Sequence, residues 1–106
     1  MARKSDKNTD PVSTYIVSYD ICDPKRLRLV FKLMKGWGMH MQYSVFQCNL
    51  KAQDLTELQS NLEDLIDHSV DQVLFVDVGP VRGRAKNAIT SIGKAHTIPL
   101  DGPVIV

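Results

Sequence analysis

The sequence predicts an α+β domain in which two helices cover one face of a mainly antiparallel sheet. Two amphipathic helical patterns alternate with short segments rich in β-branched and aromatic residues, and 106 residues are enough for one hydrophobic core. Each helix must bury its apolar stripe, and the compact solution places both helices on the same side of the sheet. The order strand, helix, strand or hairpin, helix, strand then corresponds to the ferredoxin-like βαββαβ arrangement.

The first strand and the first helix carry clear local signals. Residues 13–19, STYIVSY, are β-branched and aromatic and alternate well enough for a strand, which ends at Asp20. Asp23 is a suitable N-cap, and Pro24 fits the first helical position, where no backbone N–H is needed. The helix then shows apolar residues at three- and four-residue steps and is stopped by Gly36 and Gly38. Its apolar stripe consists of Leu27, Val30, Phe31, Met34 and Trp37.

The middle of the chain repeats this alternation. Residues 39–50 predict either one long strand or two pieces with an irregularity near Gln42. The helical step returns from about residue 52 to residue 67, and residues 72–78, QVLFVDV, predict another strand that Gly79-Pro80 breaks. The stripe of the second helix consists of Leu55, Leu58, Leu62, Leu65 and Ile66.

The two ends of the chain are less regular. Residues 1–12 are polar and predict a disordered leader, so that one domain occupies residues 13–106. Residues 85–92 fit a short helix and a short strand equally, and the final PVIV is typical of an edge strand. A sheet with helices on one side leaves its other face open, so we expect the segment of about residues 85–106 to serve dimerisation by joining a second chain.

The composition is that of a globular protein without a membrane segment. The sequence is 43% hydrophobic and 24% charged, and no apolar run approaches the roughly 20 residues that span a bilayer. Because the N-terminal residues lack the apolar stretch of a secretory signal, we expect a cytoplasmic protein. Cys22 and Cys48 form no CxxC pair or zinc-type cluster and are expected to be reduced thiols.

Charges are segregated along the chain although the net charge is only +1. Two segments contain bases without acids, and the stretch from Asp54 to Asp71 contains acids without bases. This segregation predicts either a dipolar surface that docks a polyanion on its basic side or merely the solvated sides of amphipathic elements. The basic groups are Lys25, Arg26, Arg28, Lys32 and Lys35, and then Arg82, Arg84, Lys86 and Lys94.

The ordered motifs in residues 14–93 resemble one family. YIVSYDICDPKRLRLVFKLMKGWG followed by QYSVFQCNL is similar to the CRISPR-associated adaptation endonuclease family, the small partner of the CRISPR integrase. The shared pattern is a strand that ends in Tyr-Asp, then Asp and Lys-Arg, then Gln-x-Ser-Val-Phe. The tail VRGRAKNAITSIGKA with the terminal PVIV also resembles one branch of that family.

The resemblance implies a ferredoxin-like homodimer in which an extra C-terminal strand is exchanged between the chains, so that ITSIG becomes a strand. It also implies a metal-dependent phosphodiesterase that acts on RNA or DNA, and a structural role beside the integrase in spacer acquisition. The family's metal-binding and catalytic aspartate corresponds to Asp20. Three further motif positions are expected to serve phosphate contact (Arg26), hydrogen bonding or site shape (Ser44) and packing beside the site (Phe46).

The chemistry of Asp20 requires a second chain. Mg²⁺ or Mn²⁺ takes oxygen ligands, usually one or two carboxylates with water and substrate phosphate, and one aspartate per chain is a thin site. A twofold axis near Asp20 would let two Asp20 carboxylates share one ion. Arg26 or Arg28 would then neutralise charge on the phosphorane, and Arg82 and Arg84 would help to grip the nucleic acid.

Three functions remain open from the residues. The first is a divalent-metal endonuclease centred on Asp20. The second is a non-catalytic adaptor of the integrase complex that binds protospacer duplex DNA through basic surfaces. The third is a ferredoxin-like module that binds a small ligand, or a toxin-like ribonuclease, because related small folds serve both.

Overall fold

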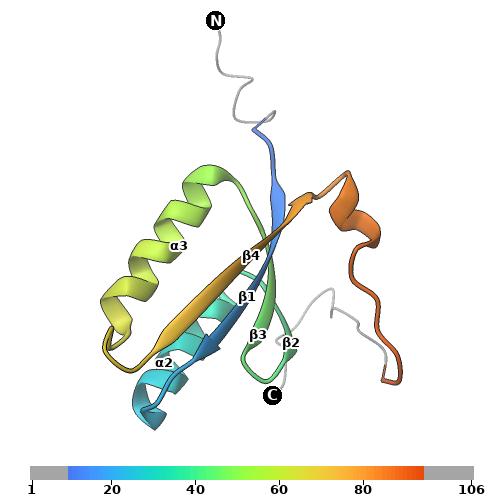
Figure 1. The fold of residues 1–106 in the computed structure, drawn as a ribbon. Helices are drawn as coiled ribbons and strands as arrows, with labels where there is room; N and C mark the ends of the chain where they lie inside the picture. The colour runs from blue at the N-terminus through green and yellow to red at the C-terminus, as the bar shows by residue number, and fades with distance from the viewer. Residues whose placement is uncertain (1–9, 95–106) are drawn as a thin grey trace, which may run out of the picture.

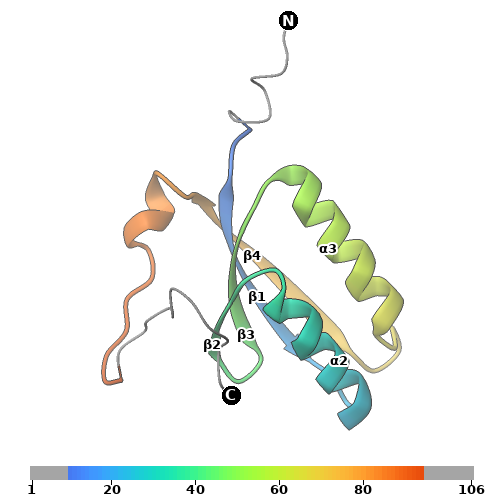
Figure 2. The same cartoon turned by 180° about the vertical axis from the view of Figure 1, so that it is seen from behind.

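A computed structural model describes residues 10–94, and its elements follow the predicted order (Figure 1). The sheet has the strand order β2-β3-β1-β4, and every neighbouring pair is antiparallel. Both helices cover the same face, which Figure 2 shows toward the viewer. The α+β, ferredoxin-like βαββαβ fold is therefore confirmed. The elements are β1 (Ser13–Asp20), α2 (Pro24–Lys35), β2 (Met39–Gln42), β3 (Val45–Leu50), α3 (Ala52–Leu65), β4 (Gln72–Pro80) and the 3₁₀ turn η1 (Arg84–Asn87).

Helix α2 begins as its sequence predicts. The Asp23 carboxylate accepts a hydrogen bond from the Arg26 backbone N–H at 2.9 Å, and Pro24 occupies the first turn. Val30 and Met34 are fully buried against the sheet, whereas Leu27 is 37% exposed. The apolar stripe therefore engages the core mainly through the later turns of the helix.

The segment 39–50 forms two strands, as the second of the two alternatives predicted. The register of β2 against β3 shifts between His40 and Gln42, which places the irregularity where the sequence suggested it. Gly38 makes the approach to this hairpin possible, because a Cβ there would lie 2.5 Å from both the Cys48 Sγ and the Gln47 carbonyl oxygen.

Strand β4 continues further than predicted. Gly79 and Pro80 were expected to end it after residue 78, but they still pair with Thr14 and Ser13. A register shift on β1 between Thr14 and Tyr15, together with a φ of +117° at Gly79, accommodates the irregular end. Because β4 lies at the edge of the sheet, the missing N–H of Pro80 removes no bond from an interior ladder.

The core lies between the sheet and the two helices. On β1, Val17 and Tyr19 face the helices, whereas Ile16 and Ser18 alternate to the other side. From the same layer, Phe46 and Cys48 of β3 meet the buried residues of α2 and α3. The residues with no exposed area are Val17, Val30, Met34, Phe46, Cys48 and Leu58.

The other face of the sheet carries apolar side chains that the described part of the chain leaves open. Leu74 and Val76 of β4 are 51% and 53% exposed, and Ile16 lies opposite Val76 in the neighbouring strand. Residues 89–93, expected to form the exchanged strand, have no regular structure in the single chain. The terminal PVIV and most of the predicted leader lie outside the described residues, and no helix within residues 10–94 is long and apolar enough to cross a membrane.

Candidate functional site

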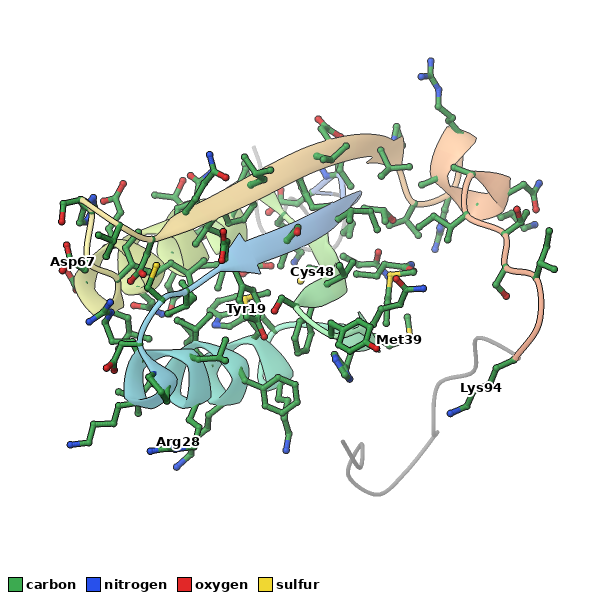
Figure 3. The ribbon with its side chains drawn as sticks, turned by 60° about the horizontal axis from the view of Figure 1, so that its bottom comes forward. Tyr19, Arg28, Met39, Cys48, Asp67 and Lys94 are labelled. Atoms are coloured by element: carbon green, nitrogen blue, oxygen red, sulfur yellow. The ribbon has the colours of Figure 1, made fainter. Side chains whose placement is uncertain are left out.

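The candidate site lies at the end of the sheet where β1 finishes. Tyr19 and Asp20 are consecutive, so their side chains point to opposite faces. Tyr19 is only 5% exposed and its ring stacks on that of Phe46, with centroids 6.3 Å apart. Figure 3 shows Tyr19 between β1 and α2. The buried tyrosine anchors the strand end, and this anchoring leaves Asp20 exposed on the other side.

The Tyr19 hydroxyl belongs to the interior rather than to the reacting surface. Burial raises the pKa of Tyr19, and the Ser44 side chain opposes only part of the rise. The hydroxyl is not in hydrogen-bonding geometry with Ser44 or with any other described residue. Tyr19 is therefore neutral at physiological pH.

Asp20 presents a carboxylate with no partner in residues 10–94. It is exposed, it closes β1 opposite Gln72 of β4, and no described side chain or backbone group hydrogen-bonds or pairs with it. A strand-end aspartate that only served the fold would accept backbone N–H groups of the turn that follows. In this chain another residue performs that task, which leaves the Asp20 oxygens available to a ligand.

That other residue is Asp71, whose side chain is fully buried. Its carboxylate accepts hydrogen bonds from the backbone N–H groups of Cys22 at 2.9 Å and Asp67 at 2.8 Å. It also pairs with the Arg26 guanidinium, at 2.8 Å from Nε and 3.3 Å from Nη2. One carboxylate thus ties together the β1–α2 loop, the first turn of α2 and the α3–β4 turn. We call this set the Asp71 clamp.

The Asp71 clamp has a clear electrostatic consequence. Hydrogen bonding to the Arg26 guanidinium, aided by the two backbone donors, holds the pKa of Asp71 far below its usual range although burial opposes this. The same contact raises the pKa of Arg26. The Cys22 thiol adds a weak contact to the Val70 carbonyl at 3.2 Å. The turn directly after Asp20 is therefore fixed by an ion pair between the buried Asp71 carboxylate and the partly exposed Arg26 guanidinium.

The clamp gives Arg26 an ion-pair partner that the sequence did not suggest. The side chain reaches Asp71, and the phosphate contact expected of Arg26 stays a prediction. Reasoning from the sequence missed Asp71 because it appeared as one acid among several near the second helix. The useful signal was its position directly before a strand that pairs with β1, since Gln72 lies opposite Asp20.

The β2–β3 hairpin lies at the same end of the sheet. The Ser44 carbonyl accepts a hydrogen bond from the Tyr19 backbone N–H at 3.0 Å, so Ser44 adjoins the motif through its backbone. Phe46 is buried beneath the hairpin and contacts the Phe31 and His40 rings, with centroids 5.6 Å and 5.1 Å away. The structure thus brings Ser44 and Phe46 next to the end of β1.

The predicted basic residues divide between two locations. Arg28 is exposed on α2 and points away from the sheet (Figure 3). Arg82 and Arg84 are exposed beyond β4, next to the start of β1, because Ser13 pairs with Pro80 while Asp20 pairs with Gln72. Seven residues of strand separate these ends, roughly 23 Å. Within one chain, Arg82 and Arg84 are therefore remote from Asp20.

The two helices also separate charge. The basic residues of α2 and the acidic residues of α3 lie on neighbouring helices that share one face of the sheet (Figure 2). The first turn of α2 contains no acid and the last turn of α3 contains no base. The first basic group and most of the acids between Asp54 and Asp71 therefore lie on two adjacent helices, and a docked polyanion stays a prediction.

The donor set at Asp20 fits a divalent metal in kind but not in number. An exposed carboxylate without a protein partner is a suitable ligand for Mg²⁺ or Mn²⁺. Among the described residues, no group of three or more His, Cys, Asp or Glu side chains is placed to hold an ion. One chain offers the ion a single ligand, so a complete site needs a carboxylate from elsewhere.

Comparison with known proteins agrees with the resemblance seen in the motifs. The model of the family described as CRISPR associated protein Cas2 matches residues 13–82. A protein of Rhodospirillum rubrum named CRISPR-associated endoribonuclease Cas2 1 is 51% identical over 81 residues, which cover 76% of this chain and 78% of that protein. A Geobacter sulfurreducens protein named CRISPR-associated endoribonuclease Cas2 is 40% identical over 92 residues, covering 87% of this chain and 96% of the relative.

Solved structures show the same likeness. The crystal structure of Streptococcus pyogenes Cas2 superposes with a TM-score of 0.66 at 28% identity, covering 76% of this chain and 99% of that one. A Thermus thermophilus protein, TT1823, gives a TM-score of 0.65 at 28% identity, with coverage of 83% and 98%. The family model matches most of the chain and the relatives share up to 51% of their residues with it, so this chain belongs to the CRISPR associated protein Cas2 family.

Proposed function

We propose that the protein is a metal-dependent endonuclease whose centre forms when two chains meet and their Asp20 carboxylates share one Mg²⁺ or Mn²⁺ ion. The observation that carries this proposal is the exposed Asp20 carboxylate, left without a partner because Asp71 satisfies the turn after it. The two relatives named endoribonucleases support a phosphodiester substrate.

The open face of the sheet supports the homodimer that this site needs. Ile16, Leu74 and Val76 form an apolar surface on the face that also carries Asp20. A second chain that covers this surface would bring the two β1 ends close to one axis, and a terminal strand could add to the partner's sheet. The dimer would therefore supply the missing carboxylate and bury the exposed apolar residues together.

The roles of the chain's residues follow from this geometry. When bound, the ion supplies polarisation of a phosphate oxygen and a more acidic water. Asp20 would hold the ion. Arg28 is exposed on α2 and points away from the sheet, so its predicted contact is with another phosphate of the nucleic acid rather than with the phosphate at the ion. In this scheme, Arg26 acts through the Asp71 clamp, because its guanidinium already pairs with the buried carboxylate. Ser44 shapes the neighbouring hairpin, and Phe46 supports it from the core.

The proposal is tested by cleavage and by metal binding as functions of pH. Purified protein should cleave RNA or DNA with Mg²⁺ or Mn²⁺ and lose that activity in EDTA. Protons compete with a metal ion for any carboxylate ligand, so calorimetric affinity for Mn²⁺ should rise from acid toward neutral pH. A flat affinity would show that no carboxylate holds the ion.

The second candidate is an adaptor that holds duplex DNA beside the CRISPR integrase during spacer acquisition. Two exposed arginines at the far end of β4 favour the adaptor. Arg82 and Arg84 are too remote from Asp20 to contact the same phosphate within one chain. The endonuclease proposal explains the exposed Asp20 but assigns no role to Arg82 and Arg84. The two candidates can coexist, since they use opposite ends of the sheet.

Salt dependence tests the adaptor. The variant Arg82→Gln/Arg84→Gln should bind duplex DNA more weakly and reduce the slope of log K against log salt concentration by about 2, one per lost phosphate contact. The matched control is Asp64→Asn on α3, an exposed residue outside the basic surface that should leave the slope unchanged. An affinity that does not depend on salt in the unmodified protein would refute the duplex-binding role.

A further inference from the structure

Tyr43 at the tip of the β2–β3 hairpin is 93% exposed, the most exposed aromatic residue in the described part of the chain. Single exposed apolar residues are common and carry no meaning by themselves. Trp37, the other aromatic residue near the hairpin that could stack on a ligand, packs against the core. Tyr43 therefore differs from Trp37, because the Tyr43 ring does not pack against the hydrophobic core.

The backbone at Tyr43 is unfavourable for a tyrosine. Its φ is +31°, and Tyr43 is the only non-glycine residue in the described range with positive φ. It occupies the first position of the two-residue connection between Gln42 and Val45, where glycine or asparagine is preferred. A bulky residue here lowers the stability of the fold, and no packing of the ring compensates for it.

The surrounding residues hold this conformation in place. The His40 Nε2 lies 2.7 Å from the Tyr43 carbonyl oxygen, and the His40 ring packs against Phe31 and Phe46, each with a centroid distance of 5.1 Å. An N–H on Nε2 is the donor in this bond, since the carbonyl can only accept. His40 thus links the backbone of the hairpin tip to the aromatic core, and this contact holds the Tyr43 backbone in place.

The hairpin tip adjoins the Asp20 end of the sheet. The Ser44 carbonyl accepts from the Tyr19 N–H at 3.0 Å, and Val45 pairs with Ser18. Tyr43 precedes Ser44 and Asp20 follows Tyr19, so both lie one residue beyond this last contact between neighbouring strands. The exposed Tyr43 and the exposed Asp20 therefore lie at the same end of the sheet, where β1 finishes.

We propose that Tyr43 stacks on an unpaired base next to the phosphate that is held at Asp20. This inference rests on the proposed phosphodiesterase function and names a residue that positions its substrate. Any base offers a face to an aromatic ring once it is unpaired, whereas a base within a duplex is already stacked on both sides. Tyr43 is a substrate-positioning residue in this scheme and takes no part in proton transfer.

A fluorescent base analogue tests the stacking without any cleavage. A single-stranded oligonucleotide that contains 2-aminopurine is titrated with the full chain in Ca²⁺, an ion that also takes oxygen ligands, and the length of the oligonucleotide is checked after the titration. Stacking on Tyr43 should quench the 2-aminopurine emission. Tyr43→Phe should keep both the quenching and the affinity, whereas Tyr43→Leu should lose the quenching and bind roughly tenfold more weakly. Binding of the matching duplex should be the same for all three proteins.

A second variant separates stacking from loss of fold. Tyr43→Asn places a residue that tolerates positive φ at the hairpin tip, so its melting temperature should rise by a few degrees. The same variant should lose the quenching as Tyr43→Leu does. A more stable protein that binds single strands less well would identify the ring as a functional residue, because a merely structural residue would improve or lose both properties together.

Three outcomes would overturn the inference. Equal quenching by Tyr43→Leu and the unmodified protein would show that the ring does not touch the base. Dissociation of the homodimer by Tyr43→Leu in sedimentation would show that the ring belongs to a contact between chains. A duplex affinity that falls as much as the single-strand affinity would show that the ring does not recognise an unpaired base.

The same measurements separate this inference from the proposed function. If the unmodified protein cleaves no substrate with any metal, yet the quenching depends on Tyr43, the phosphodiesterase proposal fails and the stacking stands. If cleavage depends on Asp20 while the Tyr43→Leu variant binds, quenches and cleaves normally, the stacking alone fails.

Discussion

We expect Asp20→Asn to abolish the proposed metal-dependent cleavage while leaving the fold and the proposed homodimer intact. Asparagine has the same shape but lacks the charge that attracts a divalent ion, and Asp20 makes no contact within residues 10–94 that the change would break. We expect cleavage to fall by at least roughly 100-fold and the melting temperature to stay within about 2 °C, as for other exposed positions. Cleavage of labelled RNA and DNA and thermal denaturation measure the two effects.

The control for this prediction is Asp64→Asn, which removes an exposed carboxylate of the same type from α3. It should cleave normally, so that a general loss of negative charge is ruled out. Cleavage by Asp20→Asn at the rate of the unmodified protein, after removal of contaminating nucleases, would contradict the role of Asp20.

Mixed dimers sharpen the test of a shared ion. If two Asp20 carboxylates hold one ion, a dimer of one unmodified chain and one chain that carries Asp20→Asn should lose most of its activity. Two independent sites would instead retain about half of it. Differently tagged chains, co-purified as the mixed dimer, give this comparison directly.

Most of the fold was predictable because its signals are local. The Asp23 cap and Pro24 begin α2 as predicted, and the alternation in residues 13–19 gives β1. The extension of β4 through Gly79 and Pro80 was not predictable in the same way. It depends on pairing with the start of β1 and on an edge position, and neither is visible in the local pattern.

The sequence suggested Asp20 as the central residue of the candidate site, but it did not suggest the Arg26–Asp71 pair that holds the turn after it. Asp20 follows from the end of a strand and from the motif around it. Arg26 and Asp71 are 45 positions apart in the sequence, and only the pairing of β1 with β4 brings them together. The sequence also did not show which of Trp37 and Tyr43 has an exposed ring. In the structure Trp37 packs against the core, whereas Tyr43 is exposed. The dimer contact also requires a second chain.

The second large effect concerns the Asp71 clamp. Asp71→Ala should lower the melting temperature by roughly 10 °C, because it leaves two backbone N–H groups and the Arg26 guanidinium without their acceptor. Arg26→Met should also destabilise the fold, because it leaves a buried carboxylate without its counter-charge. The matched control is Arg28→Met on the same helix, whose side chain is exposed and whose loss should change the melting temperature by no more than about 2 °C.

The clamp also fixes the sign of the pH dependence of stability. The pKa of Asp71 is lowered in the folded state, chiefly by the Arg26 guanidinium, whereas the unfolded chain has an ordinary value of about 4. The unfolded chain therefore binds a proton first on acidification. The stability that Asp71 contributes is fully present above about pH 4 and is lost as the pH falls below it. The Ser69 side chain lowers the pKa of Asp67, so Asp67 also makes the fold less stable in acid. The contribution of Asp71 alone is therefore obtained by comparing the unmodified protein with a variant that lacks the Asp71 carboxylate.

Thermal denaturation of the unmodified protein and of Asp71→Asn between pH 6 and pH 3 isolates that contribution. Asparagine keeps the shape of the side chain but cannot titrate, and one of its two polar atoms can no longer accept. The variant should be less stable at pH 6, and the gap should shrink steadily below pH 4 as the unmodified protein loses its advantage. A gap of constant size would mean that the clamp acts through shape and hydrogen bonding alone. The buried charge would then have no part in fixing the turn that leaves Asp20 exposed.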